Sequence, residues 1–476
     1  MHGLRKFLKT KNCSIERWIL VKSRIMKIES QKAKLSGAIR VPGSKSHTIR
    51  ALLFSSLAEG TSHIRNPLGG ADCISSSKAV PLFGAKVDIS NPNDWIVVGA
   101  GKNAHLPDDV VNVGNSGSLL YFMSPVAATF EGWTVFTGDE SIRTRPVLHV
   151  ADALKQLGAE AYISRPEKNA PPLIIKGPIK ENQTIVTDGR LSQYISGIMM
   201  AASRINGTTH IELTDPKETP FLNMTRLWLE EMGVKLEISG DYKHIQVHGP
   251  VQMKAFDKEI PSDWEAVAFP LVAALISPES EITINNIDFS GSQGDMAIVD
   301  VLKQLGADII ENKEKNTITA KYSRLSTEKL PGGELHVNLS GYPDAICALA
   351  VAGCFTEGTI VIEDIGVCRK KETDRIEVMQ KELEKLGAKI ETGSDWLKIT
   401  GHSPLNPDGT KNSAWKIHGG NIESYDDHRV AMSLAVLGLG LDSGETVTIN
   451  NAECCAVSFP DFYNKMNTIN AGFREL

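Results

Sequence analysis

Leu157-Gly158-Ala159 ends one helical pattern and starts a strand-like one, and similar triplets recur four more times along the chain. The other copies are Phe83-Gly84-Ala85, Met232-Gly233-Val234, Leu305-Gly306-Ala307 and Leu386-Gly387-Ala388. Successive glycines are 74, 75, 73 and 81 residues apart. The spacing indicates a repeated unit of roughly 75 residues, and the 476-residue chain has room for about six.

A second recurring element is a helix of small apolar residues followed by a turn and a strand rich in Thr, Ile and Val. It occurs at residues 51–64, 198–211, 271–284, 347–362 and 431–449, with a weaker copy at 127–136. A helix such as 347–354, made almost entirely of Ala, Leu, Val, Gly and Cys, has to be buried on most sides. The pattern predicts an α+β fold of two lobes, each with three units whose parallel helices lie inside outward-facing sheets, as in an inside-out α/β barrel.

The predicted lobes are discontinuous in sequence. We expect residues 26–43 and 261–476 to form the first lobe and residues 44–260 the second, with hinges near Pro42-Gly43 and at 260–262. Residues 1–27 carry eight Lys or Arg against one acid, Glu16. We expect residues 1–25 to be a disordered extension or a start placed too early, since Met26 precedes a sensible domain opening; a transit peptide is the alternative.

Composition excludes several classes of protein. A hydrophobic content of 41% and 23% charged residues are ordinary for a globular protein, and no apolar run reaches membrane-spanning length. The net charge of -6 argues against general nucleic-acid binding, which needs a surplus of cations. The seven cysteines have no metal-binding spacing, so we expect reduced thiols, a cytoplasmic location and no zinc site.

Basic or glycine-bearing residues gather at five predicted helix starts. Lys45 and Arg50 flank the first, although cations there oppose the helix dipole. The other four starts are at 115–118, 145–146, 370–375 and 426–429, with Pro146 at the first helical position of its helix. Each alone could be a solvated turn. Together they predict a small polyanionic ligand in a strongly positive cleft between the lobes.

Several segments, taken in order, resemble the enolpyruvyl transferase family, and within it the 5-enolpyruvylshikimate-3-phosphate synthase branch (3-phosphoshikimate 1-carboxyvinyltransferases). The resemblance runs from about residue 35 to 462. Its motifs are Pro42-Gly43-Ser44-Lys45-Ser46 with Arg50, Gly114-Asn115-Ser116-Gly117, Arg145-Pro146, Ser192-Gln193-Tyr194, Pro343-Asp344-Ala345, Lys371-Glu372-Thr373-Asp374-Arg375 and Asp427-His428-Arg429. The family implies two lobes of three units that close on substrate, and we expect a monomer without metal or organic cofactor.

The family reaction transfers the carboxyvinyl group of phosphoenolpyruvate to the 5-hydroxyl of shikimate 3-phosphate and releases phosphate. By resemblance, Asp344 is the base near the acceptor hydroxyl, while Glu372 and Lys45 move protons at the methylene and the bridging oxygen. From local sequence alone, Asp344 could merely cap a buried helix, and Glu372 could be a first-turn acid.

The resemblance also implies the binding residues. Lys45, Arg145, Arg375 and Arg429 are expected to hold phosphoenolpyruvate, with Gly117 leaving room beside it. Ser46, Arg50, Ser192 and Gln193 are expected to hold shikimate 3-phosphate, and Asp344 and Lys371 complete the substrate-binding set.

Five positions depart from the family pattern. Val457 stands where many members have lysine, and Tyr121 where arginine is common. On the acceptor side, Leu191, Phe221 and Val367 replace a serine, a tyrosine and an asparagine. Because a pocket built around hydroxyl and phosphate groups discriminates by polar contacts, an enzyme using another acceptor alcohol stays open.

Three further alternatives remain. The related transferase acting on a UDP-sugar has a cysteine before its Arg-Pro pair, and residues 138–146 contain none. A ring-forming DNA clamp is also built from repeated units, but it needs cations along helix faces. An inactive paralogue would retain the fold for binding only. The presence of Lys45, Asp344, Glu372 and Arg429 argues against this alternative, whereas Val457 keeps it open.

Overall fold

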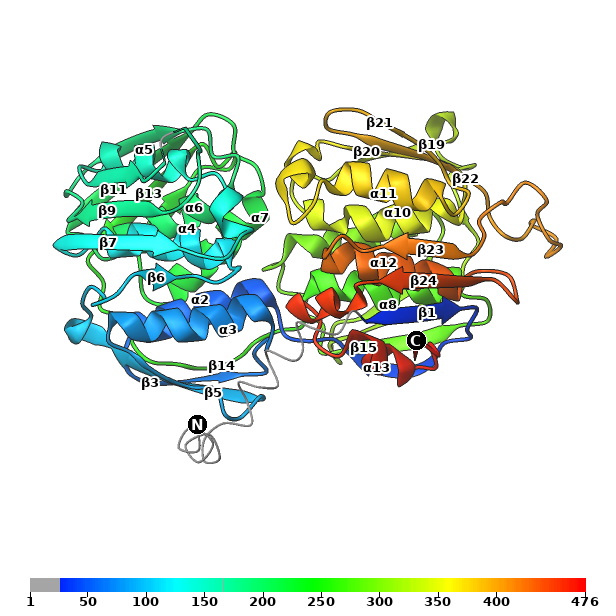
Figure 1. The fold of residues 1–476 in the computed structure, drawn as a ribbon, viewed down its shortest axis with the longest axis horizontal. Helices are drawn as coiled ribbons and strands as arrows, with labels where there is room; N and C mark the ends of the chain where they lie inside the picture. The colour runs from blue at the N-terminus through cyan, green and yellow to red at the C-terminus, as the bar shows by residue number, and fades with distance from the viewer. Residues whose placement is uncertain (1–25, 166) are drawn as a thin grey trace, which may run out of the picture.

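The chain folds around two separate hydrophobic cores. The computed structural model describes residues 26–165 and 167–476, so the expectations for residues 1–25 lie outside it. One core uses residues 28–41 and 264–473, which we call the terminal lobe; the other uses residues 49–260, the central lobe. Figure 1 shows the two lobes side by side. The predicted lobe boundaries remain a prediction, which these two cores support.

Three helices in each lobe are buried almost throughout. They are α2 (Lys45–Leu57), α4 (Gly117–Ala127) and α6 (Ser192–Ala202) in the central lobe, and α8 (Trp264–Ile276), α10 (Ile346–Cys354) and α12 (His428–Leu439) in the terminal lobe. Every residue of α10 and α12 is buried, as expected for helices with apolar side chains on all faces. None of the helices between residues 26 and 476 combines the length and apolarity needed to cross a membrane.

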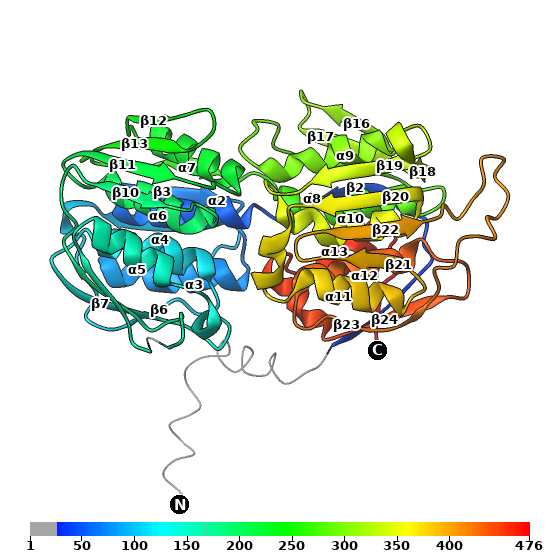
Figure 2. The ribbon, with the colours of Figure 1, turned by 90° about the horizontal axis from the view of Figure 1, so that it is seen from above.

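In the part of the chain that the structure describes, six sheets surround these helices (Figures 1 and 2), and all share one pairing pattern. In the strand orders given below, the first two strands of each sheet are parallel to each other, and the neighbours that follow are antiparallel. The central-lobe sheets are β14 (Asp257–Glu259), β3 (Glu59–Arg65), β5 (Asp94–Ala100), β4 (Lys86–Asp88); β6 (Val111–Asn112), β7 (Gly132–Thr137), β9 (Leu173–Gly177), β8 (Glu160–Ile163); and β10 (Thr184–Thr187), β11 (Gly207–Leu213), β13 (His244–Gly249), β12 (Leu236–Ile238). The fold is therefore of the α+β class.

The terminal lobe closes its last sheet with both ends of the described chain. Its sheets are β2 (Ser36–Arg40), β15 (Glu281–Asn285), β17 (Thr317–Lys321), β16 (Asp308–Asn312); β19 (Glu334–Asn338), β20 (Thr356–Glu363), β22 (Leu397–Gly401), β21 (Lys389–Thr392), with β18 (Leu325–Ser326) also on β20; and β23 (Gly420–Glu423), β24 (Thr446–Asn450), β1 (Lys27–Gln31), β25 (Arg474–Glu475). In the last of these, β1 lies between β24 and β25 and is antiparallel to both.

In each unit a residue in the left-handed conformation follows an outer helix, and after α3 a short 3-10 helix, η1 (Val80–Phe83), lies between the two. These helices are α3 (Ala71–Ala79), α5 (Leu148–Gln156), α7 (Thr219–Glu231), α9 (Ile298–Gln304), α11 (Arg375–Glu384) and α13 (Phe462–Asn467). Gly158 after α5 has φ 89°, which glycine adopts without a side-chain penalty. After α13 the same role falls to Asn470, with φ 69°, so the triplet search found five copies of this turn instead of six.

One predicted helix start is wrong by two residues. Helix α5 begins at Leu148, so Pro146 is outside it and not at its first position. The reason is a distant cap: the Asn169 side-chain oxygen accepts hydrogen bonds from the backbone N–H groups of Val147 and Leu148, at 2.9 and 2.7 Å. Local sequence does not contain this interaction.

Two neighbouring segments connect the lobes. Gly43 and Ser262 form an isolated antiparallel bridge, in which Ser44 N–H donates to Pro261 O at 2.8 Å and Asp263 N–H to Pro42 O at 3.0 Å. Both predicted hinge segments therefore lie together, and hinge motion there remains a prediction.

Candidate active site

A cavity of about 680 Å³ lies between the two lobes, where the N-terminal ends of the buried helices converge. Residues at the starts of α2, α4 and α6 line it from the central lobe, and residues at the starts of α8 and α12 line it from the terminal lobe. Asp344, just before α10, completes this set. Helix N-termini carry partial positive charge and free N–H groups, so their convergence favours an anionic ligand.

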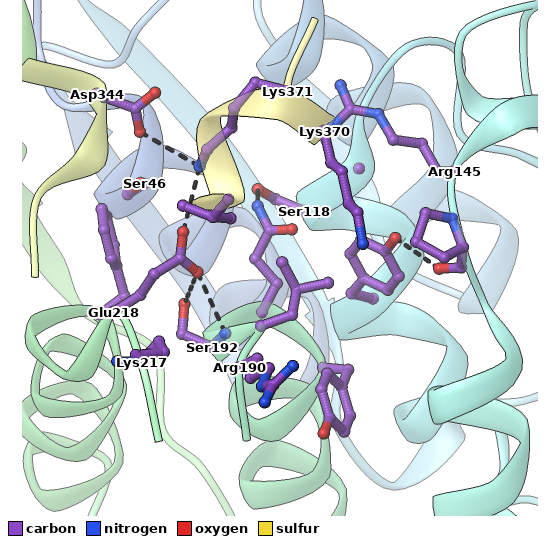
Figure 3. A pocket seen from close by; sticks show the side chains of 18 of the residues that line it. Ser46, Ser118, Arg145, Arg190, Ser192, Lys217, Glu218, Asp344, Lys370 and Lys371 are labelled. Carbon is purple, nitrogen blue, oxygen red and sulfur yellow. Dashed lines mark hydrogen bonds and ion pairs between the residues drawn. The ribbon is translucent and has the colours of Figure 1, made fainter. Parts of the chain in front are cut away.

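The structure brings together all but one of the predicted site residues. Those lining the cavity are Lys45, Ser46, Arg50, Gly117, Arg145, Ser192, Gln193, Asp344, Lys371, Glu372 and Arg429. Figure 3 shows part of this wall, with Ser46, Ser192, Asp344 and Lys371 from four different elements.

Arg375 is the exception and lies behind the cavity wall. Its side chain is fully buried, and its guanidinium donates to Asp427 at 2.8 Å, to Glu372 at 2.7 Å and to Asp344. Three carboxylates already satisfy this cation, so in this structure it positions acids and does not face the cavity, unlike the sequence expectation.

Asp344 is held by several cations. Arg429 Nε lies 3.1 Å and Lys371 Nζ 3.6 Å from its oxygens, and Arg375 donates to it. Burial alone would raise the pKa of Asp344, but these cations hold that pKa well below its ordinary value. Asp344 makes no capping hydrogen bond to α10, whose preceding residue Ala345 also lacks one, so the simple capping interpretation is wrong.

Glu372, like Asp344, lies among positively charged side chains. It accepts a hydrogen bond from Arg375 at 2.7 Å, and Arg145 lies 3.9 Å away. Burial opposes ionisation, but Arg375, His428 and Arg145 hold the pKa of Glu372 well below its ordinary value. Glu372 precedes α11, which is capped by Asp374, so it is not a first-turn acid of that helix.

Lys45 carries a charge without a close partner. Among the described residues no carboxylate lies within 4.0 Å of its ammonium group. Burial lowers the pKa of Lys45, but Asp72 and Glu265 outweigh that effect, and the pKa lies above its ordinary value. Lys45 therefore remains protonated at the mouth of α2 and faces the cavity as a cation.

Asp72 accompanies Lys45 in the cavity wall. It is buried in the first turn of α3, and desolvation raises its pKa from 3.8 to about 6 despite the opposing effect of Lys45. Between these two pH values the unfolded chain has released the proton that the folded chain still holds. Stability attributable to Asp72 therefore declines as pH rises across this window.

Asp72→Asn is expected to stabilise the protein at neutral pH and to leave stability unchanged near pH 3. The gain grows from about pH 4 to about pH 6, then stays level; a 2.2-unit difference between the two pKa values corresponds to at most about 3 kcal/mol. This difference already includes the opposing effect of Lys45 on the pKa of Asp72. Urea unfolding of both proteins at pH 4, 5, 6 and 8 measures it, and a pH-independent difference would contradict the assignment.

Arg50 is a buried cation whose polar partners are all uncharged. Its guanidinium donates to Thr225 Oγ1 at 3.0 Å, to Ser46 O at 3.0 Å and to Phe221 O at 3.2 Å. Burial without a carboxylate partner lowers the pKa of Arg50. A buried cation at the wall of a cavity, with no acid beside it among the described residues, favours an anion there.

The starts of α4 and α6 meet across the cavity wall. Gln193 Nε2 donates to Ser118 Oγ at 3.1 Å. A Cβ atom placed on Gly117 would meet only the Tyr121 ring, at 3.9 Å, so a larger residue would extend into the cavity and not into the protein. The expected place of Gly117 beside the donor substrate remains a prediction.

The prediction of a strongly positive cleft is wrong. Eight cations line the cavity: Lys45, Arg50, Arg145, Arg190, Lys217, Lys370, Lys371 and Arg429. Nine acids line it as well: Asp72, Asp188, Asp215, Glu218, Glu265, Asp344, Asp364, Glu372 and Asp395. The error arose because acids distant in sequence pair with the basic helix starts in space.

Sequence reasoning missed seven of these nine acids, among them Asp72, Glu218 and Glu265. Asp72 had an available signal, since the glycines at 69 and 70 open a helix start like the five that were considered. Glu265 lies two residues after Asp263, whose Oδ1 caps α8. The Glu265 carboxylate pairs with Arg429. Glu218 lies at the start of α7 and had no distinguishing pattern.

Four of the five departures from the family pattern line the cavity. They are Tyr121, Leu191, Phe221 and Val367. The Tyr121 hydroxyl donates to Pro146 O at 2.8 Å. Val457 is not among the lining residues; its carbonyl group packs against Gly70, where an added Cβ would come within 2.2 Å.

Comparison with known proteins gives a family. The family model for EPSP synthase (3-phosphoshikimate 1-carboxyvinyltransferase) matches residues 30–466. The chain belongs to the EPSP synthase family. A 3-phosphoshikimate 1-carboxyvinyltransferase of Acetivibrio thermocellus is 39% identical over 446 residues, which cover 94% of this chain and 99% of that protein. One from Methanococcus aeolicus is 36% identical over 451 residues, covering 94% and 99%.

Solved structures of EPSP synthases share this fold. The structure of EPSP synthase from Acinetobacter baumannii has a TM-score of 0.77 and 26% identity, covering 95% of this chain and 100% of that one. The enolpyruvyl transferase NikO from Streptomyces tendae has a TM-score of 0.75 at 17% identity, covering 95% and 99%, and is similar in fold. The recognised family and its α+β fold are therefore confirmed.

Proposed function

We propose that the cavity between the lobes transfers the carboxyvinyl group of phosphoenolpyruvate to the 5-hydroxyl of shikimate 3-phosphate and releases phosphate. As a member of the EPSP synthase family, the chain is a transferase, a 3-phosphoshikimate 1-carboxyvinyltransferase of the shikimate pathway that leads to chorismate and the aromatic amino acids. The observation that carries the proposal is the convergence of Lys45, Arg145 and Arg429 with two ionised carboxylates, Asp344 and Glu372, in one cavity.

The cations without close acidic partners indicate which part of the cavity binds the donor, phosphoenolpyruvate. Lys45 has no carboxylate within 4.0 Å among the described residues, and Arg145 has only Glu372, at 3.9 Å. Arg429 is already paired with Glu265 and Asp344. Lys45 and Arg145 are thus the cations most available for the carboxylate and phosphate of phosphoenolpyruvate, and Arg429 adds positive field from behind.

The reaction needs a proton acceptor and a proton donor. The acceptor hydroxyl loses its proton to Asp344 as its oxygen bonds to C2 of phosphoenolpyruvate, and the methylene carbon gains a proton to become a methyl group. The resulting tetrahedral intermediate then returns that methyl proton to Glu372 as the bond from C2 to the phosphate oxygen breaks, and the proton taken up by Asp344 leaves with the released phosphate. Lys45 holds a proton near the leaving oxygen throughout.

Glu372 can protonate the methylene carbon of phosphoenolpyruvate only if the pKa of Glu372 rises when substrate binds. In the structure it is ionised because cations surround it, with Arg375 contributing most and Arg145 also contributing. An anionic donor at Arg145 and Lys45 neutralises part of that charge and raises the pKa of Glu372. This coupling gives Glu372 a proton in the presence of phosphoenolpyruvate.

The acceptor end contains the remaining predicted residues. Ser46, Arg50, Ser192, Gln193 and Lys371 line it from both lobes. Arg50 supplies a buried positive charge free of acids, and the starts of α2 and α6 supply N–H groups. These features support binding of an anionic, hydroxylated acceptor.

Phosphate release tests this function. The purified chain is incubated with phosphoenolpyruvate alone, with shikimate 3-phosphate alone and with both, and phosphate is measured in each case. We expect release only with both substrates, together with the enolpyruvyl ether product by mass spectrometry. No product from a preparation with an intact cooperative melt overturns the assignment of the acceptor.

A different acceptor alcohol is the second candidate, and one observation favours it. Leu191, Phe221 and Val367, the apolar residues at positions where the family pattern has polar ones, all line the cavity. A panel of hydroxylated acceptors offered with phosphoenolpyruvate separates the two candidates.

We further propose that each lobe is an inside-out barrel, that the lobes close on substrate, and that the chain is a cytoplasmic monomer. Buried helices enclosed by sheets support the first of these proposals. The adjacent connecting segments at Gly43 and Ser262 support the second. Free cysteines among the described residues suit a reducing compartment.

A further inference from the structure

The first turn of α2 is bonded to the start of the terminal lobe, although the rest of the helix is packed in the core of the central lobe. The backbone N–H of Lys45 donates to Asp263 Oδ2 at 2.9 Å. This bond lies next to the bond from Ser44 N–H to Pro261 O. Because Asp263 also caps α8, the backbone of Lys45 is tied to a buried helix of the opposite lobe.

His47 adds a side-chain bond between the lobes. This residue is 5% exposed. Trp228 Nε1–H donates to His47 Nδ1 at 3.0 Å, so the proton of the neutral imidazole is on Nε2. Nε2–H then donates to Ser292 Oγ at 3.0 Å, and the Ser292 hydroxyl donates to Asp288 Oδ2 at 2.6 Å. Burial and the nearby Arg50 lower the pKa of His47 to about 3, which keeps the imidazole neutral.

This hydrogen-bond chain runs from the core of one lobe into the other. Trp228 belongs to α7 in the central lobe, whereas Asp288 and Ser292 follow β15 in the terminal lobe. Ser292 is 6% exposed. A buried chain in which every link has a defined donor and acceptor holds its members in one arrangement.

Lys45 needs a fixed position relative to the terminal lobe. The charges of Glu265, Arg429 and Glu372, all from that lobe, act on the Lys45 ammonium group. The proposed proton transfers at the donor also require Lys45 and Glu372 to meet the same substrate. A displacement of about 1 Å at a reacting centre can lower a rate about 100-fold.

The other end of the cavity is joined by weaker contacts. Lys217 of the central lobe pairs with Asp364 of the terminal lobe at 2.8 Å, and these side chains are 32% and 36% exposed. Exposed ion pairs contribute little free energy, so this contact separates easily when the lobes move apart. The first turn of α2, by contrast, is held by buried hydrogen bonds.

We propose that His47 is a positioning residue that, through its hydrogen bond to Ser292, holds Lys45 in place beside the terminal-lobe site residues as the lobes close on substrate. Neither His47 nor Ser292 lines the cavity, so His47 acts through Lys45 and touches no substrate. The inference rests on the proposed transfer reaction and adds a residue to its machinery.

Two amide variants of His47 separate its two hydrogen bonds. The amide nitrogen of glutamine lies about as far along the side chain as imidazole Nε2, so His47→Gln retains a donor for Ser292. The amide of asparagine reaches only as far as Nδ1, so His47→Asn retains a partner for Trp228 and loses the bond to the terminal lobe. Ser292→Ala removes the same bond from the other side. Ser413→Ala, which changes an exposed serine of the terminal lobe, is the matched control.

We expect His47→Asn and Ser292→Ala to lower kcat about 10- to 100-fold. His47→Gln and Ser413→Ala should stay within about threefold of the wild type, ~0.7 kcal/mol. Binding of shikimate 3-phosphate without phosphoenolpyruvate, measured by calorimetry, should also stay within about threefold in every variant, because Arg50 and Ser192 belong to the central lobe. Combined with Lys45→Met, His47→Asn should lower kcat no further, since His47 acts through Lys45.

Hydrogen–deuterium exchange at the backbone amides of residues 45–48 measures the attachment of α2 without turnover. We expect faster exchange there in His47→Asn and Ser292→Ala than in the wild type, His47→Gln and Ser413→Ala. Thermal melting checks that each variant is folded, and Ser292→Ala, which removes a single hydroxyl group, is the mildest of them.

The inference is overturned if folded His47→Asn and Ser292→Ala both retain kcat within about threefold. It is equally overturned if the effects of His47→Asn and Lys45→Met multiply in the double variant. Should the wild type itself release no phosphate with both substrates, the reaction assignment fails, and exchange alone decides: unchanged exchange in both variants refutes the attachment of α2 through His47, and faster exchange supports it.

Discussion

Lys45→Met should lower kcat about 100- to 1,000-fold, the effect of removing one preorganised electrostatic group at a reacting centre, ~2.7 to 4 kcal/mol. Lys45 has no ion-pair partner among the described residues, and its pKa lies above the ordinary value, so its charge is available to substrate. Methionine preserves most of the buried volume and removes only the charge and the donors. Steady-state phosphate release with both substrates measures the effect.

Lys86→Met is the matched control, because it removes an exposed lysine from β4 of the same lobe and should leave kcat unchanged. If Lys45→Met retains activity within about threefold, or ~0.7 kcal/mol, Lys45 does not act on the transition state. A loss confined to KM would place Lys45 in donor binding alone.

Asp344→Asn should have the second large effect, and it should appear in both activity and stability. Removal of the proton acceptor is expected to lower kcat about 100- to 10,000-fold. The same change leaves Arg429, Arg375 and Lys371 without a shared counter-charge in a buried site, which costs about 3 to 5 kcal/mol of unfolding free energy. Kinetic assays and urea unfolding at pH 7 measure the two effects separately.

The stability effect of Asp344→Asn has a defined pH dependence. The folded-state pKa of Asp344 is well below 3.8, so the advantage of the wild type is fully present above about pH 4 and declines as pH falls through the lower value. Asp442→Asn, which breaks the exposed pair with Lys411, should cost less than about 1 kcal/mol. Equal destabilisation by the two changes would contradict the buried cluster.

Sequence patterns predicted the turns and buried helices, because these features depend on residues close together in the chain. The glycine triplets mark left-handed turns at Gly84, Gly158, Gly233, Gly306 and Gly387, all of which have positive φ. The buried helices were predicted because apolar residues on every face leave no side for water. The sixth turn was missed because Asn470 also tolerates this conformation, and the start of α5 because its cap comes from Asn169.

The candidate site was predictable in its cations but not in its charge balance. Basic residues at helix starts can be read from sequence, and Lys45, Arg50, Arg145 and Arg429 do meet in one cavity. Their acidic neighbours arrive from other elements through long-range packing. Glu218 reaches Lys371 across 153 positions of sequence, and no local pattern encodes such a contact.

During translation, strand β1 leaves the ribosome long before the strands it joins, since Lys27 lies opposite Asn450 and Ile28 opposite Glu475. The core of the central lobe uses one continuous run, residues 49–260, and can form while the rest of the chain is still being made. The terminal lobe cannot complete its last sheet until synthesis ends. Until then, the backbone N–H and C=O groups of β1 lack their partners in β24 and β25. Chaperone occupancy and premature termination should therefore affect the terminal lobe far more than the central one.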